Sequence, residues 1–206
     1  MFNVPSLRFW YQKSTLVLLS AFVLGGSACQ DKGTMAPVVK STHQAYDLVG
    51  FLDREAQALN TKKAMVRKAV AEDGTVKETK TITSLNWTEE LAPFADADIN
   101  KPALKGLFTV DSSSDALGQQ VRRYTAKEDA RTNVQEVTYT LDAKGQLVQL
   151  DATILQDNML FGTKKVLHLE AHSGTAPHLV RYHLDETQKL LLMGAERYSV
   201  TGEVAQ

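Results

Sequence analysis

The chain has 206 residues, a formal net charge of −1 and a single cysteine. This near-neutral balance, without a basic stripe, gives no support to nucleic-acid binding. One cysteine cannot form an intramolecular disulfide, so the fold must depend on packing alone.

The first 28 residues have the three parts of a secretory signal. A head with Arg8 and Lys13 and no acidic residue precedes an uncharged apolar run at residues 14–25, and small residues follow. The run is shorter than the about 20 apolar residues that a membrane-spanning helix needs. We therefore predict a cleaved signal peptide at residues 1–28, with a buried N-terminal helix as the alternative.

Small residues lead directly into Cys29 in the stretch GSAC. This stretch resembles the lipobox of bacterial lipoproteins, although Gly26 stands where that family usually has leucine. The resemblance implies that signal peptidase II cleaves before Cys29, and that this cysteine is acylated, with palmitate among its acyl groups, to anchor the mature chain. A free thiol or an intermolecular disulfide is the alternative for an exported chain with one cysteine.

Gln30 follows the cysteine, at a position where the same family often carries Asp as a signal for retention in the inner membrane. The resemblance therefore implies localisation to the cell outer membrane, on its periplasmic or its surface leaflet. Each buried methylene contributes about 0.8 kcal/mol, so two or three acyl chains give a stable anchor. We expect a lipid-anchored protein of the cell envelope, with the membrane as its partner through acylated Cys29.

Residues 29–42 contain Gly, Pro, Ser and Thr without periodicity, which predicts a lipidated tether. A first edge strand through Val38 and Val39 is the alternative. The remaining residues, 43–206, predict a single globular α+β domain, because this length is ample for one hydrophobic core.

Two helices are predicted in this domain. Residues 43–60 place apolar side chains three or four positions apart, with Thr42 as the expected cap and the charged residues 53–55 off the apolar stripe. This stripe favours a core-facing helix over a partner-binding one. Residues 86–97 form the second helix, with Asn86 in the cap position.

The rest of the domain predicts antiparallel strands. Asp73-Gly74, between arms at 65–70 and 75–82, is the strongest hairpin signal, and a second hairpin joins residues 134–141 to 146–155. The regular alternation of apolar and polar residues in the second hairpin indicates one buried face and one solvent-exposed face. Further strands are expected at residues 106–111, 119–124, 166–171, 178–184, 189–193 and 196–201. The predicted fold class is α+β: an antiparallel β-meander sheet of roughly seven to nine strands, packed against an N-terminal amphipathic helix and one short helix.

Two groups of polar residues have the composition of metal sites. The first, Asp96, Asp98 and Asn100, begins like a calcium loop. The pattern then departs from such a loop, because Lys101 stands where glycine is required and Leu107 where glutamate is required. We therefore favour a helix end, in which the Asp and Asn side chains bond to nearby backbone.

The second group lies around the expected turn at residues 173–177. If His172 faces His178 across it, Glu170 shares their face, and two imidazoles and a carboxylate could hold zinc with an open position. A shift of one residue pairs His168 with His183 instead. The metal candidates are therefore His168, Glu170, His172 and His178, and we expect neither a resident metal nor a cofactor.

The sequence contains no pattern that supports nucleophilic catalysis. The chain lacks a G-x-S-x-G elbow, and Cys29 is assigned to the lipid. Ser112, Ser113 and Ser114 precede Asp115 in a stretch that predicts a polar loop. We predict no catalytic residue, and the only functional residue that we assign is Cys29.

The stretch DINKPALKG, residues 98–106, and its surroundings resemble uncharacterised envelope lipoproteins of Bacteroidota-type bacteria. This resemblance implies a location without a mechanism. We expect a non-catalytic, membrane-anchored envelope lipoprotein that binds a partner protein or envelope component. The alternatives are a periplasmic carrier or sensor of an apolar or lipid ligand, similar to half-barrel carriers, and a metal-dependent enzyme. A carrier would need an internal apolar cavity, and an enzyme would need the zinc site.

Overall fold

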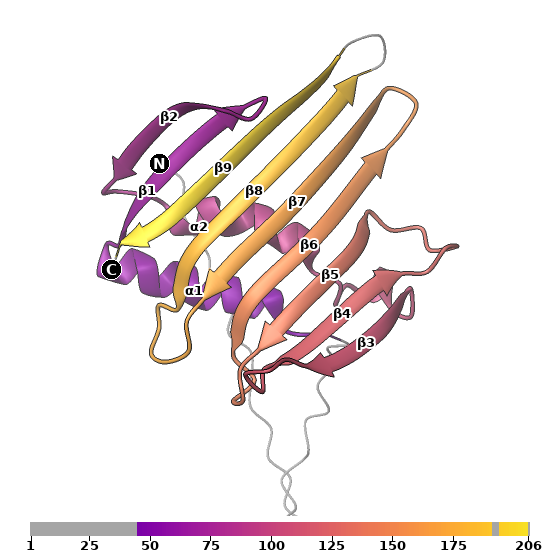
Figure 1. Ribbon diagram of the computed structural model, residues 1–206, viewed down its shortest axis with the longest axis horizontal. Helices are drawn as coiled ribbons and strands as arrows, with labels where there is room; N and C mark the ends of the chain where they lie inside the picture. Colours follow the sequence, from indigo (N-terminus) through magenta and orange to yellow (C-terminus); the bar gives the residue numbers. More distant parts are fainter. Residues whose placement is uncertain (1–44, 191–193, 206) are drawn as a thin grey trace, which may run out of the picture. The chain divides into compact units, whose positions relative to one another are not determined.

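The computed structural model describes residues 45–190 and 194–205 of the chain (Figure 1). The predicted signal peptide, Cys29, the tether and the expected cap Thr42 lie outside these residues, as do residues 191–193 of the strand expected at 189–193. These assignments remain predictions. Within the described residues, no helix is long and apolar enough to cross a bilayer.

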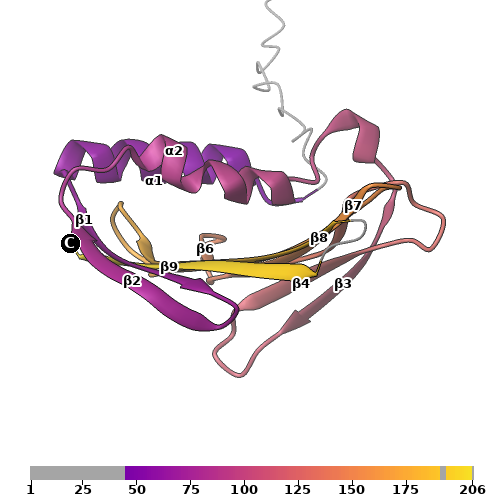
Figure 2. The same ribbon diagram turned by 90° about the horizontal axis from the view of Figure 1, so that it is seen from above.

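The described residues have an α+β architecture, as predicted, and form nine antiparallel strands in one sheet with helices against one of its faces (Figures 1 and 2). The helical elements are α1 (Leu48–Lys62), α2 (Trp87–Leu91) and two short 3₁₀ helices, η1 (Ala92–Ala97) and η2 (Pro102–Leu104). The strands are β1 (Met65–Glu72), β2 (Thr75–Ile82), β3 (Phe108–Ser114), β4 (Gln120–Ala126), β5 (Val134–Leu141), β6 (Leu147–Asp157), β7 (Phe161–Ala171), β8 (Leu179–Leu190) and β9 (Ala195–Ala205).

The strand order is β2-β1-β9-β8-β7-β6-β5-β4-β3. From β3 to β9 the chain is a meander in which each strand lies beside its predecessor. The β1–β2 hairpin joins on the far side of β9, with Val66 paired to Val204. Residues 83–107, which include α2, η1 and η2, carry the chain from one edge of the sheet to the other.

Helix α1 begins later than the predicted residue 43. Its cap is Asp47, whose carboxylate accepts a hydrogen bond from the N–H of Gly50 at 3.0 Å, and it ends at Lys63 in the left-handed conformation. The apolar stripe faces the sheet, as expected of a core helix. The placement of Glu55 outside the buried face was wrong, because this side chain is 1% exposed.

The predicted second helix is divided into α2 and η1. Asn86 caps α2 as expected, accepting from the N–H of Thr88 at 3.2 Å. The α-helical pattern stops after Leu91 because Pro93 has no N–H to continue it, and the chain tightens into the 3₁₀ helix η1. The indole N–H of Trp87 donates to the carbonyl of Ala64 at 3.3 Å, which attaches α2 to the end of α1.

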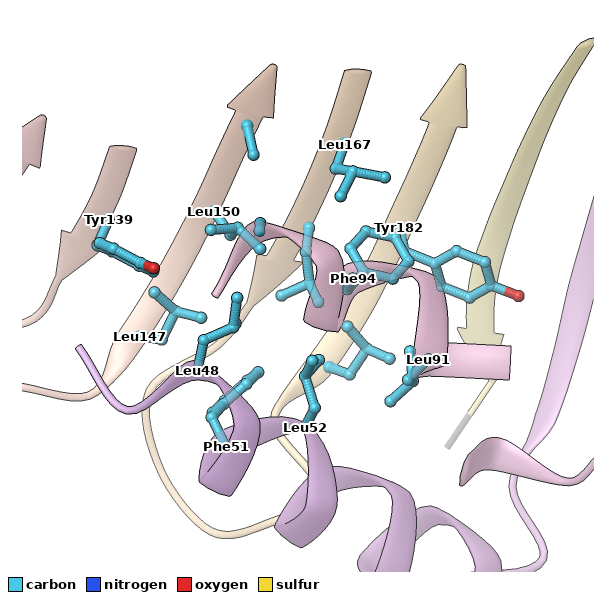
Figure 3. Close-up of a cluster of buried hydrophobic side chains, with 14 of the residues drawn as sticks. Leu48, Phe51, Leu52, Leu91, Phe94, Tyr139, Leu147, Leu150, Leu167 and Tyr182 are labelled. Atoms are coloured by element: carbon cyan, nitrogen blue, oxygen red, sulfur yellow. The ribbon is translucent and has the colours of Figure 1, made fainter. Parts of the chain in front are cut away.

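The core lies between the helices and the sheet, and side chains from both layers fill it (Figure 3). The residues labelled there are Leu48, Phe51 and Leu52 from α1, Leu91 from α2, Phe94 from η1, and Tyr139, Leu147, Leu150, Leu167 and Tyr182 from the strands. Each fully buried Leu or Phe contributes about 1.5–3 kcal/mol. Among the described residues, this filled interface covers one face of the sheet, and no helix packs against the other face (Figure 2).

Two strand predictions need correction. Ser112, Ser113 and Ser114 belong to β3, not to a polar loop, because they pair with β4 at the edge of the sheet. The segments expected at 178–184 and 189–193 join in a single strand, β8, as far as Leu190. The alternation predicted for the second hairpin is confirmed, since Val137, Tyr139 and Leu141 are buried between polar neighbours.

Candidate functional site: an ion-pair network on the open face of the sheet

The open face of the sheet is the side away from α1 and α2 (Figure 2). Register aligns a row of polar residues across four strands: Asp151 pairs with His168, His168 with His183, and His183 with Thr201. Their neighbours along each strand, such as Leu150 and Leu167, point into the core. The two-residue period of the strands therefore places this row on the solvent side.

His168 is at the centre of the row. Its Nδ1 lies 2.6 Å from Oδ1 of Asp151, and its Nε2 lies 2.9 Å from Oε1 of Glu170. Burial lowers the pKa of His168, but the hydrogen bonds and charges of the two carboxylates outweigh this effect and raise it above the ordinary value. A ring that faces a carboxylate at each nitrogen donates from both, so this arrangement favours the imidazolium form.

The network extends to both sides of His168. Glu170 also accepts from the guanidinium of Arg181, with Nη2 at 2.8 Å and Nε at 3.3 Å. The hydrogen bond from His168 and then that from Arg181 lower the pKa of Glu170. On the other side, the amide of Gln149 donates to Asp151 at 2.7 Å. Three strands thus contribute five side chains to one continuous set of charge-assisted hydrogen bonds.

Neighbouring groups on this face are paired as well. Nδ1 of His183 lies 2.8 Å from the hydroxyl of Thr201. Arg197 holds Asp185 with Nη2 at 2.7 Å and Nε at 2.8 Å. The charged side chains named here on the open face are therefore already oriented by one another.

The network lacks the arrangement that activates a nucleophile. A triad needs one imidazole that contacts both a hydroxyl and a carboxylate. Here His183 contacts the hydroxyl of Thr201, whereas His168 contacts the carboxylates of Asp151 and Glu170. Within the described part of the chain, neither His168 nor His183 contacts both a hydroxyl and a carboxylate in this network.

The predicted metal candidates separate into two places. His168 and Glu170 lie on the open face, whereas His172 and His178 meet at the turn between β7 and β8, with ring centroids 6.0 Å apart. A register shift between Glu170 and Ala171 allows both histidine pairings that the sequence presented as alternatives. Over the two described segments, no group of three or more His, Cys, Asp or Glu side chains is arranged to hold a metal ion.

His178 has a structural role instead. Its Nδ1 and its backbone N–H each lie 2.6 Å from the carboxylate of Glu55, and the N–H of Leu179 donates to the same carboxylate at 2.9 Å. Nε2 of His178 lies 3.0 Å from the carbonyl of Gly174. A buried carboxylate on α1 therefore holds the start of β8 against the helix layer.

The candidate calcium residues form a local scaffold, as expected of a helix end. Asp98 accepts from the backbone N–H and the side-chain amide of Asn100, at 3.0 and 3.1 Å. Asn100 in turn accepts from the N–H of Ala45 and donates to the carbonyl of Tyr46, both at 2.9 Å. Asp96 is separate and pairs with Lys165 at 2.8 Å. These contacts fix the point where the chain enters the described domain.

Sequence reasoning missed Asp151 and Arg181 as partners in the network. The alternation of β6 already placed Asp151 on a wet face, and that signal was present in the sequence. Its contact with His168, however, depends on the pairing of β6 with β7, which alternation alone does not determine.

Comparison with known proteins finds no significant similarity: no family model, curated sequence or solved structure matches the chain.

Proposed function

We propose that the protein is a non-catalytic lipoprotein of the cell envelope, anchored through acylated Cys29, that binds a partner protein or envelope component on the open face of its sheet. The observation that carries this proposal is the contrast between the two faces. One face is sealed by helices over a filled core, and the other presents the oriented network centred on His168.

Such a network is suited to recognition of a charged partner. Arg181 and Glu170 are partly exposed, with 46% and 35% of their side chains accessible, so a partner could reach them. Their mutual hydrogen bonds fix their directions before binding, which reduces the entropy that a complex must lose. Paired charges of both signs favour a partner with a complementary pattern over one of uniform charge.

The two alternatives have less support. A carrier of an apolar ligand would need free volume between the helices and the sheet, where the described side chains form a continuous core. A zinc enzyme would need His172, His178 and Glu170 on one face, and Glu170 instead binds His168 and Arg181 on the open face.

The test is a mild crosslinking pull-down from native membranes with a C-terminal tag. Wild-type protein is expected to recover one envelope component in stoichiometric amount, and Cys29→Ala to lose it because the protein is no longer delivered to the membrane. Glu170→Gln should reduce the recovery by disrupting the network. The matched control is Glu78→Gln on edge strand β2, where a surface glutamate pairs with Lys80 away from the network.

The contrary outcomes are distinct. Recovery of the wild-type protein alone would contradict a stable partner. Equal recovery by Glu170→Gln and Glu78→Gln would show that a partner exists but does not use the open face.

A further inference from the structure

The turn between β6 and β7 exposes large apolar side chains. Met159 is 92% exposed and Leu160 is 67% exposed, and Leu155 and Leu190 are exposed on the adjoining strands. The four residues border one shallow hollow of about 490 Å³ at this end of the sheet. Figure 1 shows the turn projecting beyond the helix layer, at the end of the sheet where β6 and β8 end.

Folding does not require apolar residues in this turn. The N–H of Asn158 donates to the carbonyl of Phe161 at 3.0 Å, and the Asn158 side chain accepts from the N–H groups of Leu160 and Phe161, at 2.8 and 3.1 Å. These bonds use the backbone of Asn158, Leu160 and Phe161 and the side chain of Asn158, and none uses the side chain of Met159 or Leu160. Hairpin turns usually carry Gly, Asn or Asp, a role that Asn158 fills here, whereas large apolar residues such as Met159 and Leu160 are not required. The chain uses such residues elsewhere, as in Asp73-Gly74.

Two lysines stand immediately behind the apolar turn. Lys164 on β7 and Lys189 on β8 border the same hollow and are exposed. Among residues 45–190 and 194–205, neither forms an ion pair, in contrast to Lys165, which binds Asp96 and Glu186. Lysine stems can lie along apolar surface while their ammonium groups reach lipid phosphates.

We propose that the β6–β7 turn inserts Met159 and Leu160 into the headgroup region of a bilayer that contains anionic lipids, with Lys164 and Lys189 at the phosphates. A projecting apolar tip with free cations behind it matches a lipid surface, where the inserted side chains leave water without needing a complementary groove. This inference goes beyond the proposed function, because it concerns a surface separate from the network on the open face.

Chain length allows the turn to reach the membrane that holds the proposed anchor. Fifteen residues lie between Cys29 and Ala45, and the sixteen Cα–Cα steps from one to the other can span at most about 55 Å. Tyr46 packs against Tyr139, near the end of β6 that is opposite the turn. Because the eleven residues of β6 extend about 35 Å, the tether exceeds the distance that the domain must cover.

The test uses the full-length protein. If Cys29 is acylated, which mass spectrometry verifies, Met159→Cys introduces the single free thiol and takes an environment-sensitive nitrobenzoxadiazole label. The matched control is Leu117→Cys, an 83% exposed leucine in the β3–β4 turn at the opposite end of the sheet. If Cys29 is not acylated, the same labels are placed in a Cys29→Ala background.

In vesicles of phosphatidylethanolamine and phosphatidylglycerol, the label at position 159 should shift its emission to the blue and be quenched by spin-labelled acyl chains. The label at position 117 should do neither. Both effects at 159 should weaken in phosphatidylcholine alone and in the Lys164→Gln variant. Leu160→Glu should lower vesicle binding of unacylated protein by about tenfold or more, since it removes an inserted side chain and adds an anion.

Equal behaviour of the two labels would overturn the proposal. So would a blue shift at position 159 without vesicles, which would indicate a protein contact or a second copy of the chain. Neither result would affect the pull-down with Glu170→Gln, so failure of the membrane contact and failure of the proposed function can be distinguished.

Discussion

Replacing Glu55 by alanine should lower the free energy of unfolding by about 3–5 kcal/mol, because it removes a buried carboxylate that accepts several hydrogen bonds. The Glu55 carboxylate is 1% exposed and receives the N–H groups of His178 and Leu179 at 2.6 and 2.9 Å, with the His178 ring also at 2.6 Å. Each buried donor that loses its acceptor costs about 1–3 kcal/mol. The two backbone donors alone therefore account for most of the expected loss.

Two further substitutions separate the contributions of the Glu55 carboxylate and the His178 ring to this loss of stability. Glu55→Gln keeps the shape of the side chain and one acceptor oxygen, but it places an amide NH₂ group against one of the N–H donors. We therefore expect a smaller loss in the free energy of unfolding, about 1–3 kcal/mol. His178→Ala removes the ring and keeps the backbone donors, and it should cost about 1 kcal/mol. Urea unfolding followed by far-UV circular dichroism measures all three, with an unchanged m value as the condition for comparing them.

Glu203→Ala is the control for this experiment. Glu203 is an exposed glutamate 3.3 Å from Arg67, and such surface pairs contribute less than about 1 kcal/mol. If Glu55→Ala were no more destabilising than Glu203→Ala, the carboxylate would not be the anchor between α1 and β8, and the reasoning from its burial would be refuted.

Three other predictions use the same unfolding measurement. Because the carboxylates raise the pKa of His168, the network should stabilise the folded protein fully below the ordinary histidine pKa of about 6.5 and less as pH rises through the raised value. His168→Gln should abolish this loss of stability at higher pH. If the variant and the wild type had the same dependence of stability on pH, the assignment to His168 would be contradicted. Tyr182→Phe should cost about 1–3 kcal/mol, because the hydroxyl donates to Glu90 at 2.5 Å. Tyr139→Phe should leave the free energy of unfolding unchanged, because the buried Tyr139 hydroxyl has no hydrogen-bond partner within the described residues. A loss as large as that of Tyr182→Phe would contradict this expectation. Gly202→Ala should destabilise, because a Cβ there would lie 2.1 Å from the Tyr182 ring, and a neutral result would show that the ring can move away.

Local patterns predicted most of the secondary structure because each one has a local cause. Asp73 and Gly74 both adopt positive φ, which is the reason that this dipeptide marked the β1–β2 turn. Alternation of apolar and polar residues identified β5 and β6, since one face of each lies on the core. These signals needed no knowledge of the rest of the chain.

Long-range arrangement was less accessible. The pairing of β1 with β9 joins residues far apart in the sequence, and nothing near Val66 indicates Val204 as its partner. Glu55 looked like a solvent-facing charge because its acceptor role depends on backbone N–H groups more than 120 residues away. In the same way, His168 could be placed on a wet face, but its carboxylate partners followed from register and a bulge that periodicity does not encode.

The place of β9 between β1 and β8 has a consequence for how the domain matures. A chain that emerges from a ribosome or a translocation channel presents α1 and the β1–β2 hairpin early, whereas the strand that joins this hairpin to the sheet follows only after all the others. Closing such a distant pairing is slow because the entropy of the long intervening loop is lost first. Until then β1 has an unpaired edge, a template for aggregation. The interval before β9 arrives is therefore the period in which the edge of β1 is most exposed to pairing with another chain.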